Sequence, residues 1–182
     1  MPNPRRVFAP GIPYHVISRG SGRSVVFRDP SDYETYLRIL SEAKRRFKIL
    51  IYHYVLMPNH VHLVLCATAS NGSAFMRQLN LTYSLYSCRK RRKIGHVWKN
   101  RFKNIQIDSD AYLLACGNYI EMNPVRGRLV QSADEWPYSS FRHYATAEAN
   151  PVVDGNPLYT EFGKTAKERC RRYVSWIGTT RR

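Results

Sequence analysis

The 182-residue sequence has few acidic residues, few cysteines and no long apolar run. Its four cysteines lack any CxxC spacing, which disfavours both a zinc finger and the disulfide framework of a secreted scaffold. The longest apolar runs, near residues 49–57 and 61–67, are shorter than the about 20 residues that a membrane-spanning helix needs. No apolar segment follows the N-terminal charges as in a secretory signal, so we expect a cytoplasmic protein without a membrane partner.

Basic residues dominate the charge, since 29 lysines and arginines against 13 acidic residues give a net charge of +16. Such an excess favours a polyanionic partner, above all nucleic acid, because basic groups neutralise phosphates and release counterions. The charges are spread along the chain, which disfavours a basic amphipathic membrane binder. Hydrophobic residues make up 43% of the sequence, so a folded domain is expected rather than a disordered chain.

Periodicity and turn residues predict an α+β fold. The predicted strands are residues 12–18, 48–57, 60–66 and 104–108; the predicted helices begin near Ser31, at 70–73 and at 108–109, the last running to Asn123 and stopped by Pro124. This order is that of a ferredoxin-like (RRM-like) antiparallel sheet with helices on one face, which leaves the other face open for single-stranded nucleic acid. We expect one domain over residues 1–130, with its core at about 9–124, and a C-terminal extension, 131–182, docked on it.

Two histidines in the third predicted strand are candidates for metal binding. Side chains alternate along a strand, so His60 and His62 share one face while Val61, Leu63 and Leu65 point to the other. Two imidazoles at this spacing can share a divalent cation through neutral ring nitrogens. The alternative is two exposed histidines beside a hairpin turn.

The third predicted helix adds a nucleophile and an amide. Tyr119 and Asn123 are four residues apart and stack on one helix face, whereas Leu113, Cys116 and Ile120 form an apolar stripe that can pack on the sheet. By itself a tyrosine at this spacing is ordinarily a buried phenol. Together with the histidine pair, these residues make a minimal metal-assisted phosphotransfer site in a basic protein.

Several segments carry a resemblance to single-tyrosine HUH transposases, and in particular to REP-associated tyrosine transposases. The matching segments are LMPNHVHLV (56–64), which resembles the HUH motif, YIEMNPVR (119–126), which resembles the nucleophile helix, YHVISRG (14–20), WKNRF (98–102) and WPYSS (136–140). They span about residues 9 to 144, in order. The resemblance implies a ferredoxin-like fold of the HUH nuclease type in a bacterial, nucleoid-associated protein.

The resemblance also implies roles for individual residues. His60 and His62 would bind Mg²⁺ or Mn²⁺, with Asn123 as the third protein ligand. Tyr119 would attack the scissile phosphate of single-stranded DNA and leave a 5′-phosphotyrosine and a free 3′-OH. The DNA would be a REP-type hairpin with a flanking single-stranded tetranucleotide. The long C-terminal tail favours a monomer over a dimer that swaps the nucleophile helix.

Other polar residues of these segments receive different roles. Glu121 lies on the opposite side of the predicted helix from Tyr119, so it is not counted as a ligand, and His15 and His53 are expected to be structural or to face DNA. The DNA-binding candidates are the cations and the tryptophan near the basic stretch and the N-terminus: Arg5, Arg6, Arg19, Arg89, Arg91, Arg92, Lys93, Trp98, Lys99, Arg101 and Lys103. Trp98, with Phe102 beside it, would stack on bases. Each cation could instead belong to a solvated surface.

Three other functions fit parts of the pattern. A non-catalytic single-stranded nucleic-acid-binding module explains the charge and the sheet, but not His60, His62, Tyr119 and Asn123 together. An HUH replication initiator or relaxase usually carries extra domains and a second nearby tyrosine; Tyr112 lies seven residues before Tyr119 without a matching motif. A structural protein with a polyanion-binding surface explains the charge alone.

Overall fold

A computed structural model describes residues 6–92 and 94–179 of the chain. Its centre is a four-stranded antiparallel sheet in the order β2-β3-β1-β4. The strands are β1 (Pro13–Arg19), β2 (Ile49–Met57), β3 (His60–Ala67) and β4 (Lys103–Gln106). This is the predicted ferredoxin-like α+β sheet, and the predicted hairpin between the second and third strands is confirmed.

The helices are α1 (Pro30–Phe47), α2 (Gly72–Arg91), α3 (Asp110–Glu121), α4 (Asn123–Arg126), α5 (Phe141–Thr146) and α6 (Ala166–Thr179). Short 3-10 turns lie at Ser21–Arg23, Ala133–Glu135 and Pro157–Phe162. Side-chain caps fix two starts: Asp29 accepts from the backbone N–H of Asp32, and Ser109 from that of Tyr112. Within the described residues, no helix is long and apolar enough to cross a membrane.

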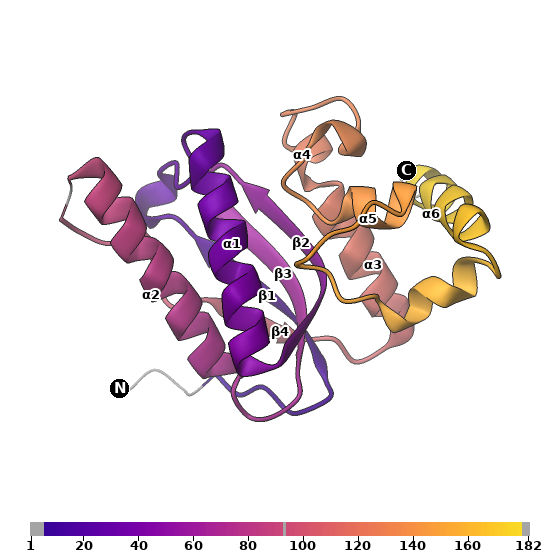
Figure 1. Cartoon of the computed structure of the whole chain (residues 1–182), viewed down its shortest axis with the longest axis horizontal. Helices are drawn as coiled ribbons and strands as arrows, with labels where there is room; N and C mark the ends of the chain where they lie inside the picture. The colour runs from indigo at the N-terminus through magenta and orange to yellow at the C-terminus, as the bar shows by residue number, and fades with distance from the viewer. Residues whose placement is uncertain (1–5, 93, 180–182) are drawn as a thin grey trace.

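Helices α1 and α2 cover one face of the sheet (Figure 1). Val61, Leu63 and Leu65 of β3 point to this side, where they join a buried cluster with Leu40 of α1 and Leu79 of α2. The alternation predicted for the third strand is therefore confirmed. The largest hydrophobic core of the domain lies on this face and holds β3 in register.

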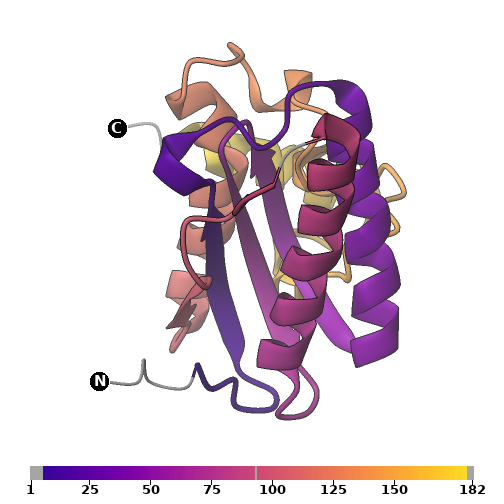
Figure 2. The ribbon, with the colours of Figure 1, turned by 90° about the vertical axis from the view of Figure 1, so that its left-hand side faces the viewer.

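The expectation of an open second face is wrong, because α3 lies against it. Figure 2 shows the sheet between α1 and α2 on one side and α3 on the other. Cys116 and Ile120 of α3 are buried with Val55 of β2 and Val64 of β3. Both strands carry apolar side chains on this second face as well, Val55 on β2 and Val64 on β3, so nearly every residue of the two strands is buried or half-buried. The predicted apolar stripe of the third helix covers these side chains.

Glycine at position 117 lets α3 approach the sheet closely. A Cβ atom there would lie 2.7 Å from His53 Nε2, and real Cβ contacts are essentially never that short.

The prediction that Pro124 ends the helical segment is wrong. Pro124 sits in the first turn of α4, where a missing N–H costs nothing, and only Met122 separates the two helices.

The segment after α4 packs back onto β2 and α3. Leu56 donates its backbone N–H to the Tyr138 carbonyl at 2.9 Å, and Ser139 forms an isolated β-bridge with Val55. Asp154 accepts from the Ile51 N–H at 2.8 Å, and its carboxylate lies 2.7 Å from Lys44 Nζ. Further along, Tyr173 of α6 belongs to a third buried cluster, to which α5 also contributes side chains. The boundary at residue 130 stays a prediction.

Candidate active site

His60 and His62 lie together on the face of the sheet that α3 covers, and their ring centroids are 4.9 Å apart. His60 opens β3 and is half-buried, whereas His62 is 1% exposed. His60 Nδ1 lies 2.6 Å from the side-chain oxygen of Asn59, the turn residue before it. The hairpin between β2 and β3 therefore fixes both imidazoles on rigid backbone.

The buried ring of His62 is held by a third histidine. Its Nδ1 lies 2.7 Å from His15 Nε2, on the neighbouring strand β1. Its Nε2 is buried and has no hydrogen-bond partner within the described part of the chain. Buried polar atoms are nearly always paired, so this unpaired ring nitrogen is a candidate ligand atom. When His62 donates its Nδ1 proton to His15, Nε2 carries a lone pair.

All three imidazoles are neutral at pH 7. Burial lowers the pKa of His62 to about 2, and repulsion from Arg19, and from His15 and His60 when these are protonated, acts in the same direction. Burial and Arg19 lower the pKa of His60 to about 4, against an opposing hydrogen bond with Asn123. Burial alone lowers the pKa of His15 to about 4. Neutral imidazole is the form that binds a metal.

Tyr119 and Asn123 complete the cluster from α3 and α4. The Tyr119 side chain is 42% exposed, and its ring centroid lies 5.7 Å from that of His62 and 6.2 Å from that of His15. Asn123 Nδ2 donates to the Tyr119 carbonyl at 2.7 Å, and the Asn123 side chain also hydrogen-bonds His60. The structure thus brings the four predicted site residues together, with an accessible phenol beside neutral imidazoles.

Arg126 belongs to this cluster although the sequence analysis gave it no role. Its guanidinium carbon lies 5.2 Å from the centroid of the Tyr119 ring. The position follows from α4, because helical turns continue past Pro124 and return residue 126 to the side of residue 119. Because the sequence analysis ended the helix at Pro124, it did not predict that Arg126 lies beside Tyr119. A cation here can stabilise negative charge on the phenolate oxygen or on a phosphate.

His53 and Glu121 form a separate buried cluster beneath α3. Their side chains meet at 2.9 Å, and Glu121 also accepts from Ser140 at 2.6 Å and from Tyr173 at 2.7 Å. Asn156 Nδ2 lies 2.9 Å from His53 Nε2, which satisfies the second ring nitrogen. These contacts tie α3 to the C-terminal segment, so the prediction that Glu121 is not a ligand agrees with its position.

The predicted DNA-binding residues divide into three groups. Arg19, Arg89, Arg92, Lys99, Arg101 and Lys103 are exposed, and Arg6 is half-buried with its guanidinium carbon 5.2 Å from the centroid of the Phe102 ring. Arg5 and Lys93 lie outside the described residues. Arg91 and Trp98, the third group, are placed elsewhere than expected.

Arg91 and Trp98 make contacts inside the protein, and their roles in DNA binding stay predictions. Arg91 forms an ion pair with the fully buried carboxylate of Asp32 and bonds Ser87, so α1 and α2 use its charge internally. Trp98 is only 9% exposed, and its Nε1 donates to the Asn80 carbonyl at 3.1 Å. The indole ring packs against the core, so little of it is exposed.

The donor set fits a divalent metal ion. His62 Nε2 is a buried nitrogen without a partner among the described residues, His60 is neutral, and Asn123 offers an amide oxygen beside them. Imidazole nitrogen with carbonyl oxygen suits Mn²⁺, and oxygen donors suit Mg²⁺. No group of three His, Cys, Asp or Glu side chains suited to a metal occurs in residues 6–92 and 94–179. A metal at this place therefore depends on Asn123 or on substrate oxygens.

Comparison with known proteins agrees with this geometry. The family model for IS200-like transposases matches residues 9–123, which include all four site residues. The chain belongs to the IS200-like transposase family. The resemblance noted in the sequence is therefore confirmed at the level of the family. A Haemophilus influenzae protein described as a putative REP-associated tyrosine transposase is 27% identical in an alignment of 177 positions that covers 86% of this chain and 96% of that protein.

Solved structures share the fold of this IS200-like transposase. A REP-associated tyrosine transposase bound to a REP hairpin has a TM-score of 0.69 at 21% identity, over 86% of this chain and 93% of that one. The tRNA(His) guanylyltransferase of Saccharomyces cerevisiae has a TM-score of 0.51 at 11% identity, over 97% and 82%. Because one sheet topology supports such different chemistries, the function of this transposase has to be argued from its site.

Proposed function

We propose that the chain is a metal-dependent single-stranded DNA endonuclease and strand transferase that works through a 5′-phosphotyrosine at Tyr119. The observation that carries the proposal is the position of Tyr119: an accessible phenol 5.7 Å from His62, whose buried Nε2 has no partner among the described residues. A nucleophile next to an unpaired ring nitrogen that can bind a metal is the arrangement that metal-assisted phosphoryl transfer needs.

The chemical step exchanges one phosphodiester for another. Tyr119 Oη attacks the phosphorus, the new P–O(tyrosine) bond forms, and the bond to the 3′ oxygen breaks. The phenol loses its proton and the leaving oxygen takes one up, so the products are a 5′-phosphotyrosine and a free 3′-OH. The reverse reaction, with the 3′-OH of another strand as nucleophile, rejoins DNA without ATP.

The protein groups around Tyr119 have distinct parts in this step. His60, His62 and Asn123 would hold Mg²⁺ or Mn²⁺, which supplies Lewis-acid polarisation of the scissile phosphate when bound. Arg126, 5.2 Å from the Tyr119 ring, places a positive charge beside the phosphate that Tyr119 would attack. Asn123 donates to the Tyr119 carbonyl and so steadies the start of α4 relative to the nucleophile.

The proposed DNA is a REP-like hairpin with a single-stranded flank. The net charge of +16 supports a nucleic-acid partner, and a structural relative with the same fold was solved with a REP hairpin. Arg19 supports the placement of a strand at the site, because its charge lies close enough to lower the pKa of both His60 and His62. A phosphate bound there would face this cation.

We expect the protein to act as a monomer, with Tyr119 working on the metal site of its own chain. The contacts of Tyr119 with His62 and His15 are made within one chain, and Asn123 bridges both sides of the site. Mixing Tyr119→Phe with His60→Ala tests this directly. A cis enzyme stays inactive in the mixture, whereas a dimer that swaps the helix recovers activity.

The central experiment is a denaturing gel of the protein with labelled hairpin oligonucleotides that carry single-stranded flanks. With Mn²⁺ we expect a covalent protein–DNA adduct, and with EDTA none. Tyr119→Phe should abolish the adduct, while Tyr112→Phe should retain it. Tyr112 is the matched control, since it lies on the same helix and is also exposed at 36%. Hairpin binding without any adduct across a broad panel would contradict the proposal and favour a binding module.

A further inference from the structure

The carboxylate of Glu121 joins four parts of the chain, two residues after Tyr119. Glu121 is the last residue of α3 and is fully buried. Its Oε1 lies 2.9 Å from His53 Nδ1 of β2 and accepts from the Ser140 hydroxyl, just before α5, at 2.6 Å. Its Oε2 accepts from the Tyr173 hydroxyl of α6 at 2.7 Å. The sheet, the helix of the proposed nucleophile and the C-terminal segment after α4 therefore meet at one side chain.

The hydrogen positions in this cluster are mutually consistent. Asn156 Nδ2 is a donor, so His53 Nε2 accepts from it at 2.9 Å, and the proton of the neutral ring lies on Nδ1 and points to Glu121. Burial raises the pKa of Tyr173 well above its ordinary value, so its hydroxyl keeps the proton that it donates. Glu121 thus accepts from three donors, and a carboxylate holds such donors more strongly than a neutral acceptor does.

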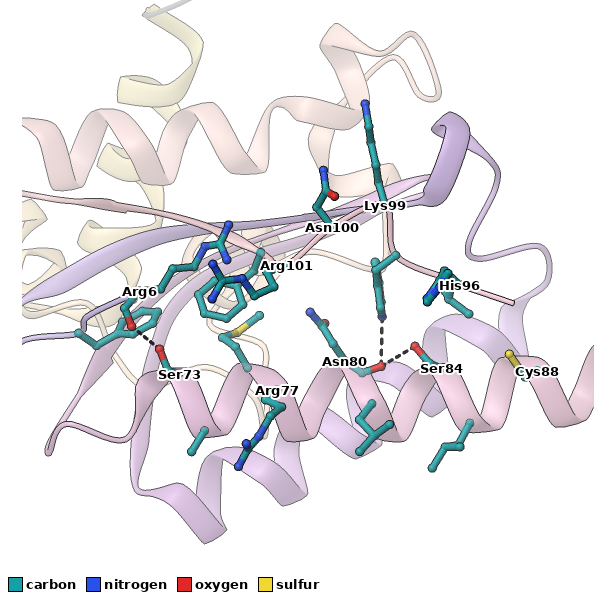
Figure 3. A pocket seen from close by; sticks show the side chains of 18 of the residues that line it. Arg6, Ser73, Arg77, Asn80, Ser84, Cys88, His96, Lys99, Asn100 and Arg101 are labelled. Carbon is teal, nitrogen blue, oxygen red and sulfur yellow. Dashed lines mark hydrogen bonds between the residues drawn. The ribbon is translucent and has the colours of Figure 1, made fainter. Parts of the chain in front are cut away.

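The polar contacts of α2, on the other side of the sheet, are of a different kind. Figure 3 shows Ser84 donating to the carbonyl of Asn80 on the same helix, and Ser73 donating to the carbonyl of Arg6. Each of these hydroxyls binds one backbone acceptor, so replacing it removes one bond. Glu121 is instead the shared acceptor of three side chains from distant parts of the chain, and its loss leaves three buried donors unpaired.

Tyr119 depends on its helix for its position. Its hydroxyl has no hydrogen-bond partner within the described residues, and its ring meets those of His15 and His62 edge-on. The apolar stripe of α3 holds the helix on the sheet, but apolar contact is not directional. Residues two apart point about 200° away from one another around a helix. A rotation of α3 that released Glu121 on the inner side would therefore also move Tyr119 on the outer side.

We propose that Glu121, held by His53, Ser140 and Tyr173, is a positioning residue that fixes the rotation of α3 and so directs Tyr119 at the scissile phosphate. A helix with its side chains has a radius of about 5–6 Å, so a rotation of about 10° moves a side-chain tip by about 1 Å. A displacement of about 1 Å can lower a rate by about a hundredfold. The inference rests on the proposed function, because it takes Tyr119 as the nucleophile, and it gives the C-terminal segment a part in the reaction.

The test removes one hydroxyl of this cluster far along the chain from Tyr119. Tyr173→Phe keeps the buried ring and loses the bond to Glu121. Tyr83→Phe is the matched control, since Tyr83 is also buried and donates to the Val26 carbonyl at 3.2 Å on the α2 side of the sheet. The adduct rate constant is measured with saturating hairpin DNA and Mn²⁺, at a temperature where thermal melts show each variant to be folded. Hairpin affinity is measured separately in EDTA.

We expect Tyr173→Phe to lower the adduct rate constant about tenfold and to leave hairpin affinity within about twofold, because the nucleophile is misplaced while the DNA surface is intact. Tyr83→Phe should change neither quantity by more than about twofold, although it also loses a buried hydrogen bond. Glu121→Gln, which retains an acceptor oxygen, should lose less of the rate than Glu121→Ala. A role in stability alone would leave the rate constant of every folded variant unchanged.

A second control separates Glu121 from the general packing of the C-terminal segment. The Tyr159 hydroxyl donates to the Tyr144 carbonyl at 2.6 Å, and its ring packs against that of Tyr173. Tyr159→Phe therefore perturbs the same aromatic cluster without removing a bond to Glu121, and it should keep the wild-type rate constant.

The outcomes separate this inference from the proposed function. An unchanged rate constant in Tyr173→Phe, or an equal loss in Tyr173→Phe and in either control, overturns the positioning role even when the wild-type protein forms the adduct. A loss confined to the variants of Tyr173 and Glu121 supports it. If Tyr173→Phe does not fold, Ser140→Ala removes another of the donors and decides in the same way. No adduct from the wild-type protein defeats the proposed function, and the positioning role with it.

Discussion

His53 and His62 are both 1% exposed and both lie under α3, yet their surroundings differ in one respect. Both ring nitrogens of His53 are paired, Nδ1 with Glu121 at 2.9 Å and Nε2 with Asn156 at 2.9 Å. His62 pairs only Nδ1, with His15, and its Nε2 has no partner within the described residues. Both nitrogens of the first histidine are used inside the protein, whereas the second keeps one nitrogen for the metal that we propose.

The difference teaches how to tell a structural histidine from a functional one. Burial is the same for the two side chains, so burial does not separate them. The two side chains differ in whether both ring nitrogens are hydrogen-bonded. This difference is informative because folded proteins seldom leave a buried polar atom unpaired. The neighbours agree: His53 faces a carboxylate, while His62 has an accessible tyrosine beside it.

The largest expected effect is the loss of activity on replacing His60, the half-buried partner of His62. His60→Ala should lower adduct formation with Mn²⁺ by about a thousandfold or more, since metal polarisation contributes several kcal/mol. The melting temperature should change by only a few degrees. Gel quantification and a thermal melt measure the two quantities, with His143→Ala as a control outside the site. Near wild-type adduct yield would remove His60 from the metal site.

For the buried cluster of His53 and Glu121 we expect a loss of stability. Glu121→Ala should lower the free energy of unfolding by about 3 kcal/mol, because it leaves His53, Ser140 and Tyr173 without their buried acceptor. Urea denaturation gives the value. Glu121→Gln keeps an acceptor oxygen and should cost less. If Glu121→Ala were as stable as the wild type, the cluster would not be what fastens α3 to the C-terminal segment.

The smallest effect is expected on replacing His15, which pairs with His62 but is not itself a proposed metal ligand. His15→Ala should raise the Mn²⁺ concentration for half-maximal adduct formation by about 10- to 100-fold, because His62 loses the partner that sets its tautomer. His15→Gln should recover part of this affinity, since its amide oxygen can accept from His62 Nδ1. A manganese titration gives both numbers. An unchanged titration in His15→Ala would mean that His62 needs no such support.

Much of the site could be predicted from the sequence because its spacings are local. Period two in a strand places His60 and His62 together, and a spacing of four in helical turns places Tyr119 beside Asn123. The resemblance to the transposase motifs added the link between these two pairs. Neither pattern could show that Arg126 returns to Tyr119, because that depends on how the chain continues past Pro124.

The basic stretch was the least predictable part. Arg89 and Arg91 are close neighbours in sequence, but one is exposed and the other is bound to the buried Asp32 of α1. Which cation points inward depends on where a carboxylate from a distant helix lies. Trp98 likewise donates its indole N–H to the Asn80 carbonyl of α2, a contact that no local pattern predicts.

The sequence by itself determined the order of strands and helices, the shared face of the two histidines and the positive charge, because these depend on local periodicity and composition. Only the tertiary structure decided that α3 covers the second face of the sheet, that Arg91 pairs with the buried Asp32, and that both ring nitrogens of His53 are paired while His62 Nε2 has no partner among the described residues. The physical reason is that hydrogen-bond satisfaction and burial are properties of contacts between residues far apart in the chain, which no local pattern specifies.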